Sequence, residues 1–144
     1  MPGIIRRNEF PSDIDVDCLI VGGGAAGLTA ALAAHEAGAT VLIAERETRL
    51  SGSTALSSGL IPAAGTRAQQ AQRIDDSEDI FCADILHKNR DSVDPIYVQQ
   101  IVQQISKTID WLSESYNIPF HVLDNFLYPG HSNHRMHAVP ETTG

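Results

Sequence analysis

The sequence predicts an α/β fold, and this prediction depends on two apolar strand runs with a glycine-rich turn and a helix between them. Leu19-Ile20-Val21 is a run typical of a buried strand, and residues 40–44 form a second run rich in β-branched residues. Residues 28–37 are rich in alanine, which favours a helix, and Gly38 follows where a glycine commonly ends one. We therefore expect a strand, a turn, a helix and a second strand over residues 15–47.

The turn carries the spacing Gly-x-Gly-x-x-Gly at Gly22, Gly24 and Gly27. Gly22 is expected to reverse the chain, Gly24 to let the backbone approach a pyrophosphate, and Gly27 to let the helix pack close to the strand. The N–H groups that open the helix would face the phosphates, because the helix dipole favours negative charge there. Glu45, at the end of the second strand, can accept hydrogen bonds from both ribose hydroxyls of an adenosine. The pattern predicts a site for the ADP half of a dinucleotide, and the alternative is a turn in an ordinary α/β domain that binds nothing.

Composition limits the class of protein. The chain has 144 residues, of which 42% are hydrophobic and 19% charged, so we expect about one globular domain. The net charge of -8 argues against nucleic acid or an anionic membrane as the main partner. Cys18 and Cys82 each fall inside a predicted element, where they are expected to be small buried hydrophobes rather than a disulfide or metal ligands.

The amino terminus gives the expected location. Residues 1–14 are expected to be a flexible lead-in, without the apolar core of a signal peptide and without the features of a transit peptide. No apolar run of the sequence is long enough to span a bilayer. A cytoplasmic location is the default expectation.

Small residues with few charges fill positions 50–65. Such a stretch is suited to lying in an extended conformation against a flat ligand, and a flexible Gly/Ser connection is the alternative. Beyond it, residues 66–76 are expected to be a loop or a frayed helix.

Two helices and a short strand are expected in the second half. The first helix covers residues 77–89, with Ser77 or Asp76 as its cap and Ile80, Phe81, Ile85 and Leu86 on one side. The second begins at Asp94, has Pro95 at its first position and ends at Asn117. Its apolar stripe is expected to be core and consists of Val98, Ile101, Val102, Ile105, Ile109 and Leu112. Residues 120–123 follow as a short strand.

Three of the six histidines gather beside an arginine in residues 131–137. No acid or cysteine joins this cluster and its spacing matches no zinc-site pattern, so no metal site is predicted. His and Arg both donate to carboxylates, which favours an anion-binding or active-site loop. A solvated polar loop is the alternative.

Taken together, these motifs resemble a known family. In chain order they are Gly22 to Gly27, Glu45-Arg46, Gly52-Ser53-Thr54, Ser58-Gly59, Gly130-His131-Ser132, Arg135, His137 and Thr143-Gly144. The order is similar to the FAD-binding domain of flavoproteins related to fumarate reductase, succinate dehydrogenase, L-aspartate oxidase and 3-ketosteroid dehydrogenase. The resemblance covers nearly everything from Asp15 to Gly144.

The resemblance implies a Rossmann-like FAD-binding domain of the two-dinucleotide-binding-domain type, incomplete at its carboxyl end, with FAD as the cofactor. It assigns the pyrophosphate to Gly22, Gly23, Gly24, Ala25, Ala26 and Gly27, and the adenosine ribose to Glu45, with Arg46 beside it. It assigns the path toward the flavin ring to Gly52, Ser53, Thr54, Ser58 and Gly59. His131, Ser132 and Arg135 would lie on the active-site side, without an assigned chemical role.

The function implied is that of an FAD-dependent oxidoreductase acting on CH–CH bonds, with hydride passing between a substrate carbon and flavin N5. We expect residues 15–144 to be the amino-terminal part of the flavin domain in a longer protein, inactive alone, with a small-molecule substrate and an unknown electron-transfer partner. An NAD(P)-dependent dehydrogenase would share the glycine fingerprint and Glu45 but has no use for residues 52–59. A non-catalytic nucleotide-binding module is the other alternative.

Overall fold

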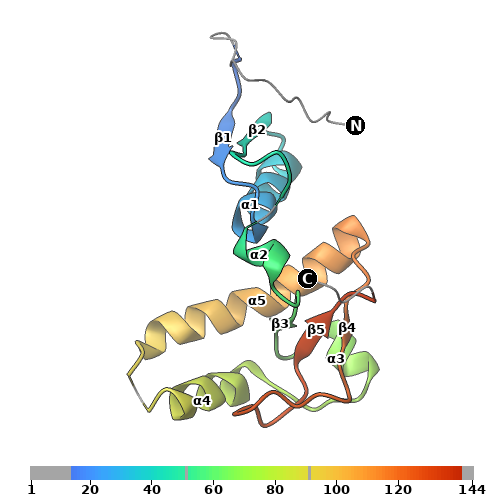
Figure 1. Ribbon diagram of the computed structural model, residues 1–144. Coiled ribbons are helices and arrows are strands. Elements are labelled where there is room, and N and C mark those ends of the chain that lie inside the picture. Colours follow the sequence, from blue (N-terminus) through green and yellow to red (C-terminus); the bar gives the residue numbers. More distant parts are fainter. Residues whose placement is uncertain (1–13, 51, 91, 141–144) are drawn as a thin grey trace. The chain divides into compact units, whose positions relative to one another are not determined.

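The computed structural model describes residues 14–50, 52–90 and 92–140, which fall into two compact units that meet in sequence between Ser57 and Ser58 (Figure 1). Each unit is described by itself. The predicted lead-in lies outside the described residues except for Ile14, and so does the Thr143-Gly144 pair.

The first unit is the predicted strand, helix and strand, followed by a short helix. Its elements are β1 (Cys18–Val21), α1 (Ala25–Glu36), β2 (Val41–Ala44) and α2 (Ser53–Leu56). The two strands are parallel, with Leu19 opposite Leu42. Beyond the paired residues, the Gly22 N–H donates to the Ala44 carbonyl at 2.8 Å. The α/β prediction for residues 15–47 is therefore confirmed.

Helix α1 begins within the glycine fingerprint, at Ala25 rather than at residue 28, and ends where the sequence predicts. Ala37 is its C-cap, and Gly38 follows with a φ of +90°, the left-handed conformation that glycine adopts without strain. The helix packs on both strands of the small sheet.

The strand run of β1 is less buried than predicted. Leu19 is 58% exposed and Val21 is 83% exposed, whereas Ile20, on the opposite face, is partly covered. Successive residues of a strand point to opposite faces, so α1 covers only one face of this two-stranded sheet among the residues that are described.

Among the described residues, the second unit combines three helices with an antiparallel sheet of three strands. They are β3 (Ile61–Pro62), α3 (Arg67–Ala71), α4 (Glu78–Lys88), α5 (Pro95–Tyr116), β4 (His121–Val122) and β5 (Met136–Ala138). The strand order is β3-β5-β4, and His137 lies opposite both Ile61 and Val122. Helices α4 and α5 pack against each other around Phe81, Val98 and Val102.

Capping residues fix both long helices where the sequence predicts. The Ser77 hydroxyl accepts from the Ile80 N–H, and the Asp94 carboxylate accepts from the Ile96 N–H at the start of α5. Pro95 occupies the first turn, and Asn117 ends the helix with a φ of +54°. These boundaries confirm the predictions for residues 77–89 and 94–117.

Other predictions need correction. The 50–65 stretch is not extended throughout, because α2 and β3 form within it. The short helix α3 agrees with the second of the two alternatives for residues 66–76, a loop or a frayed helix. Strand β5 was not expected, because three residues are too short a run to indicate a strand, and all three are buried. Ile101 is 47% exposed and Ile80 is 39% exposed, so neither is core, whereas Val98, Val102, Ile109 and Leu112 are buried as predicted.

Cys18 and Cys82 are free and only partly buried.

Among the described helices, none has both the length and the apolar character needed to cross a bilayer.

Candidate cofactor site

The turn between β1 and α1 has the conformation that its glycines predict. Gly22 has a φ of +102°, in the left-handed region that favours glycine. Gly27 lies against this residue, because a Cβ added to Gly27 would be 2.0 Å from the Gly22 carbonyl oxygen. The close packing of helix on strand predicted for Gly27 is thus confirmed.

Gly24 differs from Gly27 in what surrounds it. A Cβ at Gly24 would meet nothing nearer than the Thr54 hydroxyl oxygen, at 3.7 Å. Gly24 has ordinary dihedral angles, with φ at -75° and ψ at 178°, so neither the fold nor the backbone requires a glycine at this position. The space in front of Gly24 fits a group that is not part of the chain, which is what close approach of a pyrophosphate requires.

The start of α1 supplies the N–H donors of this site. Gly24 is the N-cap and contributes no side-chain hydrogen bond, and the first turn contains no acidic residue. The Ala25 N–H donates to the Thr54 hydroxyl at 3.2 Å, and the Leu28 N–H donates to the Gly24 carbonyl. Ala26 and Gly27, which lie between Ala25 and Leu28 in the sequence, have no intrahelical acceptor for their N–H groups. This arrangement fits an anion.

Glu45 is anchored to the turn rather than extended into solvent. One carboxylate oxygen accepts from the Gly23 N–H at 2.7 Å and the other from the Glu47 N–H at 2.9 Å. These bonds, that from Glu47 first, hold the pKa of Glu45 below its usual value, so the carboxylate is ionised. An ionised carboxylate fixed beside the turn can still accept hydrogen bonds from sugar hydroxyls through its remaining lone pairs. The Arg46 side chain is 91% exposed and pairs with Glu47.

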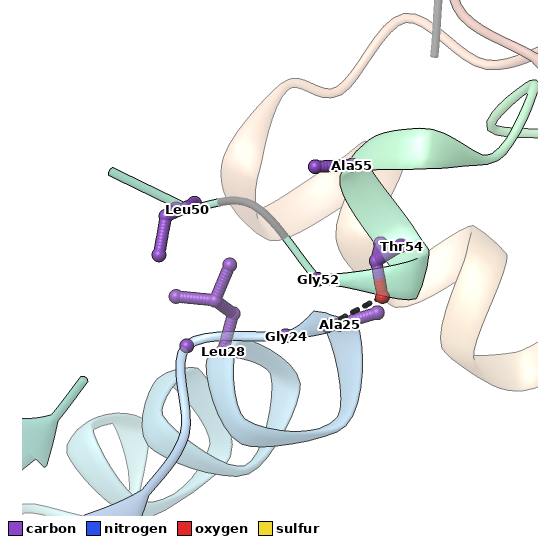
Figure 2. A pocket seen from close by; sticks show the side chains of 8 residues that line it. Gly24, Ala25, Leu28, Leu50, Gly52, Thr54 and Ala55 are labelled. Atoms are coloured by element: carbon purple, nitrogen blue, oxygen red, sulfur yellow. Dashed lines mark hydrogen bonds between the residues drawn. The ribbon is translucent and has the colours of Figure 1, made fainter. Parts of the chain in front are cut away.

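A small pocket of about 120 Å³ lies against the turn (Figure 2). Leu28 and Leu50 point toward each other across it, and Leu50 also covers Gly23, where an added Cβ would lie 2.5 Å from its Cδ2 atom. The lining consists of Gly23, Gly24, Ala25, Leu28, Leu50, Gly52, Thr54 and Ala55. Pockets that enclose a whole small-molecule ligand have volumes of about 300–1,000 Å³, so this one has room for only a part of a dinucleotide.

The remaining predicted cofactor residues are divided between the two units. Gly52 is the N-cap of α2, and Ser53 and Thr54 form its first turn, all in the first unit. Ser58 and Gly59 belong to the second unit, and Gly59 has a φ of +67°. Their contact with a flavin stays a prediction.

In the second unit, Arg135 is a fully buried cation held by two carboxylates of the chain itself. Its Nε and Nη2 atoms donate to Asp76 at 2.9 and 2.7 Å, and its Nη1 atom donates to Asp84 at 2.5 Å. Asp84 also accepts from both the N–H and the hydroxyl of Ser132. Burial raises the pKa of Asp76, but hydrogen bonds from Arg135, Asn133 and Gln69 outweigh it, and the net pKa is lowered.

This cluster corrects the expectation of an anion-binding loop at Arg135. The guanidinium has no exposed surface, and its charge is already neutralised by Asp76 and Asp84. The loop is not simply solvated either, because Ser132 is tied to α4. The sequence reasoning missed both acids, which lie 51 and 59 residues before the arginine. An active-site position for His131, Ser132 and Arg135 stays a prediction.

The three histidines of this loop have separate partners. His131 packs edge-on against Phe81 and also contacts the Tyr128 ring, and its buried Nδ1 has no hydrogen-bond partner among the described residues. His134 approaches the Phe126 carbonyl. His137 is buried, with Nδ1 at 3.0 Å from the Arg135 carbonyl and Nε2 at 2.7 Å from the Thr66 hydroxyl. Because a carbonyl only accepts, Nδ1 carries the proton and the Thr66 hydroxyl donates to Nε2.

Comparison with known families supports the FAD interpretation. The family model for the FAD binding domain matches residues 17–143, which include the turn, Glu45 and the Arg135 loop. The chain belongs to this family. FAD is therefore its cofactor, and the residues at the turn fit the diphosphate of that molecule.

Several curated relatives that share sequence with this chain are named as oxidoreductases or reductases. The chain is 36% identical over 98 residues to an NADH:fumarate oxidoreductase of Klebsiella pneumoniae (strain 342), covering 68% of this chain and 11% of that protein. It is 32% identical over 127 residues to a urocanate reductase of Eggerthella lenta, covering 88% of this chain and 21% of that protein. The chain thus spans a quarter or less of these proteins.

Solved structures share its fold. A flavocytochrome c3 fumarate reductase in an open conformation aligns with a TM-score of 0.74 and 27% identity, over 89% of this chain and 22% of that one. A 3-ketosteroid-delta4-(5alpha)-dehydrogenase from Rhodococcus jostii RHA1 aligns with a TM-score of 0.65 and 30% identity, over 73% of this chain and 22% of that one. These alignments confirm the α/β fold of an FAD-binding flavoprotein.

Proposed function

We propose that this chain holds the FAD of an oxidoreductase that acts on a carbon–carbon single or double bond. The observation that carries the proposal is the match of the FAD binding domain family over residues 17–143, on a turn whose open space at Gly24 fits a diphosphate. Bound FAD would supply hydride exchange at flavin N5 with a substrate carbon. The relatives named for fumarate and urocanate act on acids with a C=C bond beside a carboxylate, which supports a small unsaturated acid as the class of substrate.

The chain's own residues bind and orient the cofactor. The free N–H groups of Ala26 and Gly27 would donate to the diphosphate, where the α1 dipole favours negative charge. Glu45, fixed by its two backbone hydrogen bonds, would accept from the adenosine ribose hydroxyls. Residues 52–54, with Ser58 and Gly59, would line the path toward the flavin ring. Small side chains there allow close approach of a planar ring.

The test begins with the full reading frame that contains this chain. We expect the purified protein to be yellow, with flavin absorption bands, and to release FAD on denaturation. A protein that retains NAD(P) and no flavin would contradict the proposal, and so would one that binds neither.

A substitution then tests the site itself. Gly24→Val places a side chain in the open space at the turn, where the nearest protein atom to the new Cβ is 3.7 Å away. We expect the variant to fold and to bind FAD about tenfold more weakly or worse, a change worth at least ~1.4 kcal/mol. FAD retention equal to that of the unsubstituted protein would rule out this turn as the diphosphate site.

A cytoplasmic location also stays a prediction, which fractionation of the source cells would test.

A further inference from the structure

Helix α1 is capped by a residue far away in the chain. Its N-cap, Gly24, has no side chain, yet an open helix end leaves N–H groups without partners. Thr54, which lies 29 residues after Ala25, supplies an acceptor to the N–H of Ala25, the first helical residue (Figure 2). Of the pocket-lining residues in the part of the chain that the structure describes, Thr54 alone has a polar side chain.

The position of this hydrogen bond determines which N–H groups of the first turn of α1 remain available to a ligand. A Ser, Thr, Asp or Asn at the N-cap would bond the N–H of the second or third helical residue. In α1 these are Ala26 and Gly27. Thr54 instead takes the N–H of the first, so it caps the helix without using the two donors that face an incoming anion.

Local contacts hold Thr54 in place for this task. The Leu56 N–H donates to the Gly52 carbonyl, and both the N–H and the hydroxyl of Ser57 donate to the Thr54 carbonyl. These bonds fix the single turn of α2 on which Thr54 stands. The hydroxyl is therefore presented to α1 by backbone structure and not by a freely rotating loop.

We infer that Thr54 is a positioning residue for the cofactor and acts through Ala25. Its hydroxyl occupies the Ala25 N–H, so that the FAD diphosphate receives hydrogen bonds from the N–H groups of Ala26 and Gly27 instead. The inference rests on the proposed function. It differs from a direct contact between Thr54 and the cofactor, because its effect is on which backbone donors the diphosphate receives.

Amide NMR during FAD titration of the FAD-free protein tests it. In the unsubstituted protein, we expect the Ala26 and Gly27 amide resonances to shift strongly and that of Ala25 to shift little, since Ala25 keeps its bond to Thr54. In Thr54→Val the Ala25 N–H is released, so its resonance should shift with the other two. Thr54→Ser, which keeps the hydroxyl, should restore the pattern of the unsubstituted protein.

Thr40→Val is the matched control, because Thr40 also accepts a backbone N–H in the same unit, that of Asp17 at 3.0 Å. This control should leave the Ala25 resonance pattern unchanged, even if it lowers stability. A strong Ala25 shift in the unsubstituted protein, or an unchanged pattern in Thr54→Val, would overturn the inference while leaving FAD binding intact. No shift at any of the three amides would instead overturn the diphosphate site and the proposed function with it.

Discussion

Replacing Gly27 by alanine tests the packing on which the turn depends. The new Cβ would lie 2.0 Å from the Gly22 carbonyl oxygen and 3.3 Å from the Ile20 Cγ2 atom. The first distance is about 1.3 Å shorter than the ~3.3 Å at which carbon and oxygen approach in close contacts. Both neighbours are held, Gly22 by its bond to Ala44 and Ile20 by the sheet, so α1 has to move away from β1.

The magnitude follows from two opposing effects. Overpacking that forces a backbone shift costs about 1–3 kcal/mol, and this clash with backbone lies at the upper end. Alanine regains about 1 kcal/mol of helix propensity over glycine. We expect a net loss of about 2 kcal/mol in the free energy of unfolding, measured by urea denaturation of the FAD-free protein with circular dichroism.

Gly24→Ala is the matched control, since it makes the same chemical change three residues earlier where the space is open. It should cost less than about 1 kcal/mol, since alanine is a poorer N-cap residue than glycine, while weakening FAD binding. The reasoning would be refuted if Gly27→Ala were as stable as the unsubstituted protein, or if Gly24→Ala lost as much stability as Gly27→Ala.

Three further predictions concern charged groups. Glu45→Gln replaces one acceptor oxygen by an NH2 group, which cannot accept from a backbone N–H of the turn, and should weaken FAD binding in a fluorescence titration; equal affinity would contradict the role of Glu45. Arg135→Met leaves the fully buried Asp76 carboxylate without its cation and should cost about 3 kcal/mol or more in urea denaturation. Arg46→Met, at an exposed pair, should cost at most about 1 kcal/mol, and equal losses would refute the assignment. Burial lowers the pKa of His137, so its stabilising contribution is complete above the unfolded pKa of about 6.5 and falls as the pH drops below it, by at most ~1.4 kcal/mol per pH unit. His137→Gln should flatten that slope below about pH 6.5, and an unchanged slope would show that another group titrates.

Local signals explain why the first unit was predictable. The turn glycines, the helix end at Gly38 and the strand before Glu45 are each read from a few adjacent residues, and the structure has each in place. The same holds for α5, whose Asp94 cap and Asn117 end are both visible in the sequence. Such features depend on short-range hydrogen bonds and backbone preferences, which can be inferred from neighbouring residue types.

The buried ion cluster was not predictable in the same way. Asp76 and Arg135 are 59 residues apart, and neither residue type reveals which partner neutralises it. The exposure of Leu19 and Val21 was missed for a related reason, because an apolar run indicates a strand but not what covers each face. Tertiary pairing decides both, and periodicity carries no information about it.

The glycine fingerprint places two opposing requirements on the start of α1, and residues distant in the sequence satisfy both. Close approach of a diphosphate excludes a side chain at Gly24, so the usual N-cap hydroxyl or carboxylate is not available there. A helix end whose N–H groups lack acceptors is unfavourable, however, whenever no cofactor is bound. Thr54 and Glu45 satisfy the N–H groups of Ala25 and Gly23, which flank the open position, and leave the donors beyond it free. The spacing of the three glycines therefore predicts only part of this site, since an acceptor 29 residues away determines which N–H groups remain for the ligand.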